Sequence, residues 1–257
     1  MNQSALLRTY YQRYKIWIWL GVGLLLLVLV WRGCRRDDKQ WQYIKPYGIR
    51  LPLKYGIHGI DVSHHNRKID WKRVSQMQAG GVRLQFAFMK ATEGATHIDR
   101  QFARNWREAK AAGLLRGAYH FYHPRRDPKK QADNFIRQVK LQPGDLAPVL
   151  DFEIDRGVPA EELIDGLRIW LTQVEAHYGL RPIIYVNANF YKRYIAGNFD
   201  KYPLWIADYS NTQLSRYDTE KLVFWQHNKN GYVNGIQGFV DFNVFIPEPG
   251  KLNHLCL

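Results

Sequence analysis

From residue 57 to the C-terminus, short apolar segments alternate with longer amphipathic ones, and this alternation restricts the possible folds more than any other feature. The apolar segments predict eight strands, over residues 57–62, 84–90, 117–121, 147–153, 182–187, 203–207, 222–226 and 239–244. The amphipathic segments predict five helices, over residues 71–79, 99–112, 128–139, 160–177 and 190–197. Strands that alternate with helices pair in parallel, so we expect an α/β fold, in the form of an incomplete TIM-like (β/α) barrel.

The N-terminal part contains a sixteen-residue run, residues 16–31, that is apolar or glycine throughout and carries no charge. This length is near the lower limit for a helix that spans a bilayer, and flanking residues such as Trp17 and Arg32 suit the membrane interfaces. Because no small-residue cleavage site follows the run, we predict an uncleaved transmembrane signal anchor. The chain then divides into a short basic tail, the anchor, a basic linker and the barrel, over residues 1–15, 16–31, 32–56 and 57–257.

The basic charge is concentrated before the barrel. Residues 1–56 hold ten Lys or Arg and two Asp, a net charge of +8 out of +14 for the whole chain. The remaining +6 suits an anionic polymer, which could be cell wall or nucleic acid. No helix-turn-helix, RNA-binding or zinc-finger pattern is present in the sequence, so we expect no nucleic acid partner. The charges on the two sides of residues 16–31 leave the orientation of the anchor open.

The fourth predicted strand ends in Asp151-Phe152-Glu153. Side chains two positions apart on a strand share a face, so we expect Asp151 and Glu153 side by side, with Phe152 turned into the wall. Two carboxyl groups this close cannot both ionise cheaply, and we expect one pKa to rise and the other to fall. A proton donor beside an anion is what cleavage of a glycosidic bond needs. A strand end with two solvated acids is the alternative interpretation of these residues alone.

Acidic, amide and aromatic residues also mark the ends of the other predicted strands, where the active site of such a barrel is expected. Aromatic rings can stack on the C–H faces of sugars, while acids and amides hydrogen-bond hydroxyl groups. Neighbouring His64 and His65 would point to opposite faces of an extended segment, so we expect no metal, and no organic cofactor either. The candidate substrate-binding residues are Lys90, Glu93, Tyr119, Phe121, Tyr185, Asn187, Trp205, Asp208, Tyr209, Trp225, Gln226 and Asn243.

Seven motifs, in this order, resemble glycoside hydrolase family 25, the Chalaropsis-type lysozymes or N-acetylmuramidases. They read GIDVS, IDW, KATEG, GAYHF, DFE, WIADY and VDFN, at residues 59–63, 69–71, 90–94, 117–121, 151–153, 205–209 and 240–243. The resemblance covers residues 57–246 and leaves out residues 1–56. It implies a (β/α)5β3 barrel that hydrolyses the β-1,4 bond between N-acetylmuramic acid and N-acetylglucosamine in peptidoglycan.

The resemblance also implies roles for the acids. Glu153 would be the acid/base and Asp151 its partner, while Asp61 and Asp241 would complete an acidic floor. The loop over residues 235–239 has less glycine and serine than the family pattern, which puts the substrate preference in doubt.

Two other functions are compatible with parts of this pattern. A family 18 chitinase also ends a barrel strand in Asp-x-Glu, but with further acids where this chain has Leu146 and Val149. A catalytically silent peptidoglycan-binding module would keep the aromatic cleft and lose an acid, and no acid of the pattern is missing.

The shared face of Asp151 and Glu153 also bears on the mechanism. An attacking carboxylate should approach the sugar from the face opposite the acid, which is awkward for Asp151. We therefore expect the 2-acetamido group of the substrate to attack, oriented by an anionic Asp151, with net retention at the anomeric carbon. Because peptidoglycan lies outside the membrane, we expect the barrel in the periplasm or outside the cell, held by a single-pass anchor.

Overall fold

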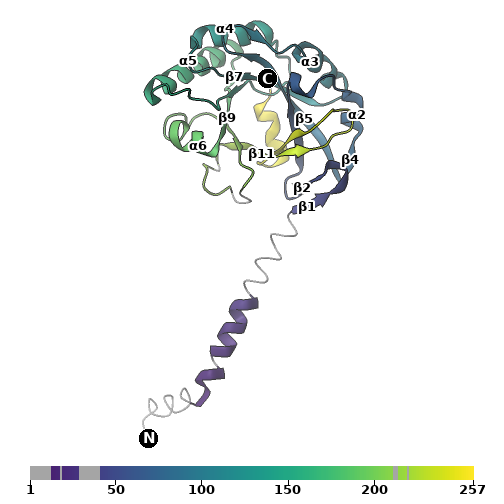
Figure 1. Cartoon of the computed structure of the whole chain (residues 1–257), viewed down its shortest axis with the longest axis vertical. Helices are drawn as coiled ribbons and strands as arrows, with labels where there is room; N and C mark the ends of the chain where they lie inside the picture. The colour runs from purple at the N-terminus through teal and green to yellow at the C-terminus, as the bar shows by residue number, and fades with distance from the viewer. Residues whose placement is uncertain (1–12, 18, 29–40, 211–213, 219) are drawn as a thin grey trace. The chain divides into compact units, whose positions relative to one another are not determined.

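The computed structural model describes residues 13–17, 19–28, 41–210, 214–218 and 220–257 (Figure 1). The chain separates into two compact units. The first comprises Met1–Tyr43 and Arg50–Lys54, and the second comprises Ile44–Ile49 and Tyr55–Leu257.

In the first unit, residues 13–17 and 19–28 are helical, and apolar side chains such as Trp17 and Leu27 are exposed. Among the residues that the structure describes, no helix is both long and apolar enough to cross a membrane. The transmembrane helix predicted over residues 16–31 is thus not found in this part of the chain. Residue 18 and residues 29–31 of that prediction lie outside the described residues.

The second unit contains an eight-stranded α/β barrel, as predicted. Its strands are β3 (Ile57–Val62), β5 (Val82–Glu93), β7 (Leu115–Phe121), β8 (Val149–Asp151), β9 (Ile183–Asn187), β10 (Leu204–Ala207), β11 (Leu222–Gly231) and β12 (Val240–Phe245). Neighbouring strands pair in this order, and β12 pairs with β3 to close the barrel.

The expected parallel pairing holds from β3 to β11 but not for β12, which is antiparallel to both β11 and β3. The reason is the short connection between β11 and β12, since a parallel crossover needs a dozen or more residues.

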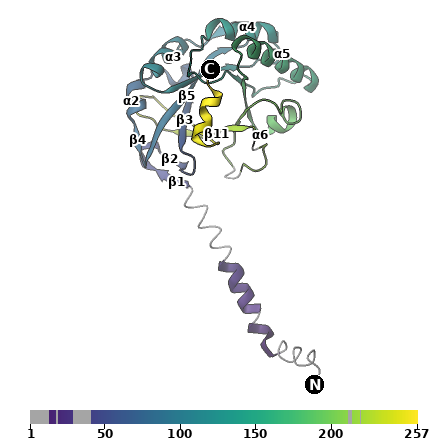
Figure 2. The ribbon, with the colours of Figure 1, turned by 180° about the vertical axis from the view of Figure 1, so that it is seen from behind.

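Helices follow the first five barrel strands and lie outside the barrel (Figures 1 and 2). The Asp70 carboxylate accepts a hydrogen bond from the Arg73 backbone N–H (3.2 Å), and Asp127 caps the helix that begins at Pro128 in the same way. The helices are α2 (Trp71–Gln76), α3 (Phe102–Ala111), α4 (Pro128–Gln138), α5 (Ala160–Tyr178) and α6 (Ala188–Phe190), with a π-helical turn at Tyr191–Ile195.

The helix predicted over residues 71–79 is shorter than expected. It ends at Gln76, because β4 (Gln78–Ala79) turns back to pair with the start of β5. A second small strand, β6 (His97–Ile98), pairs with the end of β5.

The segment interpreted above as a linker, residues 32–56, holds ordered structure in its described residues. It contains β1 (Trp41–Ile44), a 3-10 helix at Lys45–Tyr47 and β2 (Ile49–Pro52). Tyr47 is fully buried, with its ring 5.4 Å from that of Phe242, and its hydroxyl donates to the Val82 carbonyl oxygen (3.0 Å). Residues 44–49 therefore belong to the compact unit of the barrel.

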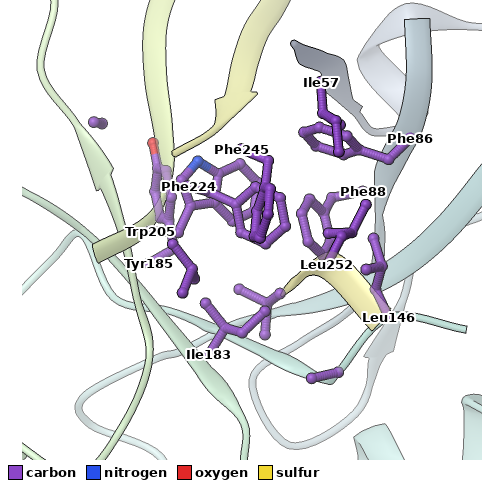
Figure 3. Packing of buried hydrophobic residues seen from close by; sticks show 14 residues of the cluster. Ile57, Phe86, Phe88, Leu146, Ile183, Tyr185, Trp205, Phe224, Phe245 and Leu252 are labelled. Atoms are coloured by element: carbon purple, nitrogen blue, oxygen red, sulfur yellow. The ribbon is translucent and has the colours of Figure 1, made fainter. Parts of the chain in front are cut away.

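Aromatic side chains fill the barrel at the N-terminal ends of its strands (Figure 3). The ring of Phe88 stacks on Trp205 at 4.6 Å and meets Phe224 edge-on at 5.1 Å. Leu252, in the C-terminal 3-10 helix Pro249–Leu255, packs against the same cluster. The interior is therefore solid at this end, and a cavity can open only at the C-terminal ends of the strands.

Gly59 has no side chain, and the ring of Phe86 occupies the space that a side chain would fill. A Cβ atom at Gly59 would lie 2.5 Å from the Phe86 ring, closer than packed atoms allow. We expect Gly59→Ala to lower the free energy of unfolding by about 1–3 kcal/mol through overpacking, as measured by denaturant titration. Gly250→Ala is the matched control, because nothing lies within 4 Å of its Cβ position. Equal unfolding midpoints for the two variants would contradict the close packing at Gly59.

Candidate active site

A cavity of about 360 Å³ lies at the C-terminal ends of the barrel strands. The structure brings all four predicted acids and seven of the predicted substrate-binding residues together around it. The lining residues are Asp61, Ser63, His65, Lys90, Tyr119, Phe121, Asp151, Glu153, Tyr185, Trp205, Tyr209, Gln226, Lys229 and Asp241.

Asp61 and Asp241 form one wall of this cavity. They occupy directly opposite positions on β3 and β12, where like charges destabilise a sheet. Asp61 is held by two amide donors, Nε2 of Gln226 at 2.8 Å and Nδ2 of Asn243 at 2.7 Å, which both bind its Oδ2. The hydrogen bonds therefore fix the orientation of the Asp61 carboxyl group.

The two amides are themselves oriented by aromatic donors. Oε1 of Gln226 accepts hydrogen bonds from the hydroxyls of Tyr185 (2.9 Å) and Tyr209 (2.5 Å). Oδ1 of Asn243 accepts one from Nε1 of Trp205 (2.8 Å). Because each amide oxygen is taken by a donor, each amide N–H₂ must face Asp61. The aromatic residues thus align the acid as well as line the cavity.

Asp151 and Glu153 form the other acidic pair. Asp151 is the last residue of β8, Phe152 is fully buried in the wall as predicted, and Glu153 lies beyond the strand end and is exposed. The two carboxyl groups lie within hydrogen-bonding reach of each other, and their mutual repulsion favours a state in which at least one of them carries a proton. The pair is therefore side by side, although only Asp151 lies within the strand.

The expectation that one pKa of this pair falls is wrong. Burial, and then the charge of Glu153, raise the pKa of Asp151 well above its usual range, and loss of solvation within the cavity also raises the pKa of Glu153, although its side chain is accessible to solvent. Among the described residues, no N–H or hydroxyl donor reaches the buried Oδ1 of Asp151, so an ionised Asp151 would be poorly solvated. Asp151 is therefore not the anion of the pair, and the shared proton lies on its side.

The pKa values of the other two acids rise as well. Burial and the nearby charge of Glu153 raise the pKa of Asp241 to about 6, while Lys229 opposes the shift. Burial and the charge of Asp241 raise the pKa of Asp61 well above its usual range, against its two amide donors. The cavity thus keeps carboxylic acid protons at a pH where exposed carboxyls have lost theirs.

Five predicted substrate-binding residues do not line the cavity: Glu93, Asn187, Asp208, Trp225 and Asn243. Glu93 pairs with Nζ of Lys90 at 2.7 Å, and Asn187 caps α6 by accepting from two backbone N–H groups. Asn243 holds Asp61 as described above. The Asp208 carboxylate accepts from the Tyr217 hydroxyl and the Arg216 guanidinium, and its carbonyl oxygen accepts from Nε1 of Trp225 (2.8 Å).

Three lining residues were not predicted: Ser63, His65 and Lys229. The first two follow β3 in a 3-10 helix at His64–Asn66 that Ser63 caps, and the His64 and His65 rings lie 4.0 Å apart. The expectation that these rings face opposite ways is wrong, because the segment is helical rather than extended. Lys229 lies in the polar end of β11, which the hydrophobic pattern does not distinguish from a loop.

The raised pKa of Asp241 has a consequence for stability. Its pKa is about 6 in the fold and 3.8 in an unfolded chain, so the stability that this carboxyl contributes is present below pH 3.8 and is lost as the pH rises through 6. Asp241→Asn removes this charge, so we expect the variant to be more stable than wild type at pH 7.5. The difference in free energy of unfolding between the variant and wild type should be about 1–2 kcal/mol larger at pH 7.5 than at pH 4. This difference is smaller than the free energy that corresponds to the whole pKa shift, because solvent screens the half-buried carboxyl and its titration is linked to that of the neighbouring acids.

Denaturant titrations at the two pH values measure this difference. Asp165→Asn on α5 is the control, because Asp165 is exposed and is distant in sequence from both Asp61 and Asp241. An Asp241→Asn effect that is the same at both pH values, or larger at pH 4, would contradict the raised pKa.

Comparisons with known proteins give a consistent result. The sequence profile of the glycosyl hydrolases family 25 matches residues 60–236. YegX of Escherichia coli strain K12 is 46% identical over 204 residues, which cover 79% of this chain and 74% of YegX. Lysozyme M1 of Streptomyces globisporus is 34% identical over 220 residues, which cover 77% of this chain and 70% of the lysozyme.

Solved structures are similar over the same region. The bacterial lysozyme from Streptomyces coelicolor has a TM-score of 0.70 and 29% sequence identity, over 78% of this chain and 97% of that one. A family 25 glycosyl hydrolase from Bacillus anthracis has a TM-score of 0.71 and 28% identity, over 79% and 95% of the two chains.

Proposed function

Since this chain belongs to the family 25 glycosyl hydrolases and is a glycoside hydrolase, we propose that its cavity cleaves the β-1,4 bond between N-acetylmuramic acid and N-acetylglucosamine in peptidoglycan. The observation that carries the proposal is the group of four carboxyls with raised pKa values in a cavity lined by aromatic rings. Such a group supplies both a proton donor and a balancing negative charge, which glycoside hydrolysis requires.

Glu153 is the residue that we assign as acid and base. It is exposed at the cavity while Asp151 is buried, so Glu153 can reach the glycosidic oxygen of a bound glycan. The proton of the pair moves from Asp151 to Glu153, and Glu153 passes it to that oxygen as the bond to the anomeric carbon breaks. In the second half of the reaction it removes a proton from the attacking water.

The attacking group in the first half is, in this proposal, the 2-acetamido oxygen of the substrate. Asp151 shares a hydrogen bond with Glu153, so it lies on the side of the acid and not on the opposite face of the sugar. The acetamido oxygen bonds to the anomeric carbon and forms an oxazolinium ion, whose positive charge the Asp151–Glu153 pair balances after its proton has left. Water then opens this ion, and the configuration is retained.

Digestion of purified peptidoglycan tests the activity and the bond. We expect new reducing ends on N-acetylmuramic acid, which borohydride reduction and mass spectrometry identify. New reducing ends on N-acetylglucosamine, or cleavage of chitin in preference to peptidoglycan, would contradict the assigned bond.

The mechanism needs separate measurements. Proton NMR of the first product formed should show the β-anomer, because the configuration is retained. A covalent sugar ester trapped on Asp151 would exclude attack by the acetamido group, and an inverted product would exclude any retaining route.

We also propose that residues 16–31 tether the enzyme to the membrane, with the barrel in the periplasm or outside the cell. The uncharged apolar run in the sequence supports a tether, as do the exposed apolar side chains of the helical residues 19–28. Extraction of membranes with alkaline carbonate should leave the full chain in the pellet. A C-terminal reporter that works only in the cytoplasm would contradict the orientation.

A further inference from the structure

Lys229 places a positive charge at the cavity beside the acidic wall. It lies at the end of β11, lines the cavity with Asp241, and is exposed. Its Nζ lies 5.4 Å from the centre of the Tyr209 ring, and that ring is held by the hydrogen bond from its hydroxyl to Gln226. A cation over an aromatic ring is attracted to the ring, so this contact holds the Lys229 ammonium group at the cavity.

The other lysine of the cavity differs in this respect. Nζ of Lys90 lies 2.7 Å from a carboxylate oxygen of Glu93 and 4.8 Å from the centre of the Phe121 ring, and the Lys90 side chain is only 10% exposed. Its charge is therefore already matched by a neighbouring acid. Within the part of the chain that the structure describes, Lys229 makes no ion pair at contact distance, although its charge acts on Asp241, and its ammonium group can bind a carboxylate from outside the protein.

A cavity lined by four carboxyl groups disfavours an anionic substrate unless a cation meets the substrate's charge. The proposed substrate has such a charge, because N-acetylmuramic acid differs from N-acetylglucosamine by an O3-linked lactyl group that ends in a carboxyl. An ammonium–carboxylate hydrogen bond is stronger than a neutral one and distinguishes the two sugars.

From these contacts we infer that Lys229 binds the free lactyl carboxylate of N-acetylmuramic acid and so makes the enzyme prefer muramyl residues without an attached peptide. The inference rests on the proposed function, since it assigns a specificity determinant within the same cavity. It requires that the enzyme distinguish substrates that differ only in the charge of their lactyl groups.

A pair of matched substrates tests it. The first is a peptidoglycan tetrasaccharide of alternating N-acetylglucosamine and N-acetylmuramic acid with free lactyl carboxyls, and the second is the same sugar with both carboxyls converted to neutral methylamides. For the full-length wild-type enzyme we expect kcat/KM to be roughly 5- to 10-fold higher on the acid. Lys229→Met keeps the length of the side chain and removes its charge, and we expect it to abolish this ratio, mainly through KM. Lys229→Arg should retain most of the preference.

The outcomes separate the inference from the proposed function. A wild type that cleaves neither tetrasaccharide nor peptidoglycan would contradict the function itself. A wild type that cleaves both sugars while Lys229→Met leaves the ratio unchanged, or lowers both rates equally, would overturn the inference alone. A third sugar that bears a dipeptide on the lactyl group completes the test, because a Lys229-dependent preference found only there would place the recognised carboxylate on the peptide. Lys251→Met, an exposed lysine in the C-terminal 3-10 helix, is the control and should leave the ratio unchanged.

Discussion

Glu153→Gln should lower kcat on peptidoglycan by about 10³-fold or more, the largest effect that we expect from any single substitution. The amide has the shape of the acid but no proton to give to the leaving oxygen, and general acid catalysis contributes about 10²–10⁴-fold. Because Glu153 is exposed at the end of β8 and its removal leaves no buried charge, the fold should be unaffected. Steady-state kinetics measure the loss, and sedimentation with insoluble peptidoglycan should show that binding persists.

The control for this experiment is Glu248→Gln, which changes an exposed glutamate at the start of the C-terminal 3-10 helix. This variant should keep wild-type activity. If Glu153→Gln retained more than about a tenth of wild-type kcat, another group would have to be the acid.

Asp151→Asn should lower kcat by about 10²-fold and also change the pH profile. In the wild type the last proton of the pair is held mainly by Asp151, whose pKa is raised well above its usual range, whereas the variant has only the proton of Glu153 itself. The variant should lose its catalytic proton more easily, so the alkaline limb of the kcat profile should move to lower pH. A profile recorded from pH 4 to pH 9 on soluble peptidoglycan fragments measures both effects.

Asp165→Asn, the exposed substitution on α5, should change neither the rate nor the profile. A reduced rate for Asp151→Asn with an unchanged alkaline limb would mean that Asp151 acts on the substrate and not through Glu153. A limb that moved to higher pH would contradict the shared proton.

The barrel could be predicted from the sequence because its strands are apolar runs whose ends are marked by acidic, amide and aromatic residues. The first barrel strand has the predicted bounds, Ile57–Val62, and the caps at Asp70 and Asp127 mark the starts of two helices. These features depend on neighbouring residues alone. The pairing of β12 with β3 and the burial of Tyr47 against Phe242 depend on contacts between distant segments, which a local pattern does not contain.

The candidate site divides in the same way. Its acids and most of its aromatic residues follow strands that are visible in the sequence, and a barrel collects such positions at one end. The protonation of Asp151 could not be predicted, because it depends on how deeply the carboxyl is buried and on which donors reach it. Lys229 was missed because it lies in a short polar stretch, Asn228–Asn230, and its side chain reaches the cavity only after β11 and β12 have paired.

The acidic wall joins the first and the last strand of the barrel. Nδ2 of Asn243 on β12 donates to Asp61 on β3 across 182 residues of sequence, and Asp241 lies directly opposite Asp61. A ribosome-bound chain that has not yet extended past β12 therefore has half of this wall and an open barrel, whatever its earlier strands have formed. Activity therefore appears only after β12 has been made, and translation products or proteolytic fragments that lack β12 should be inert toward the glycan.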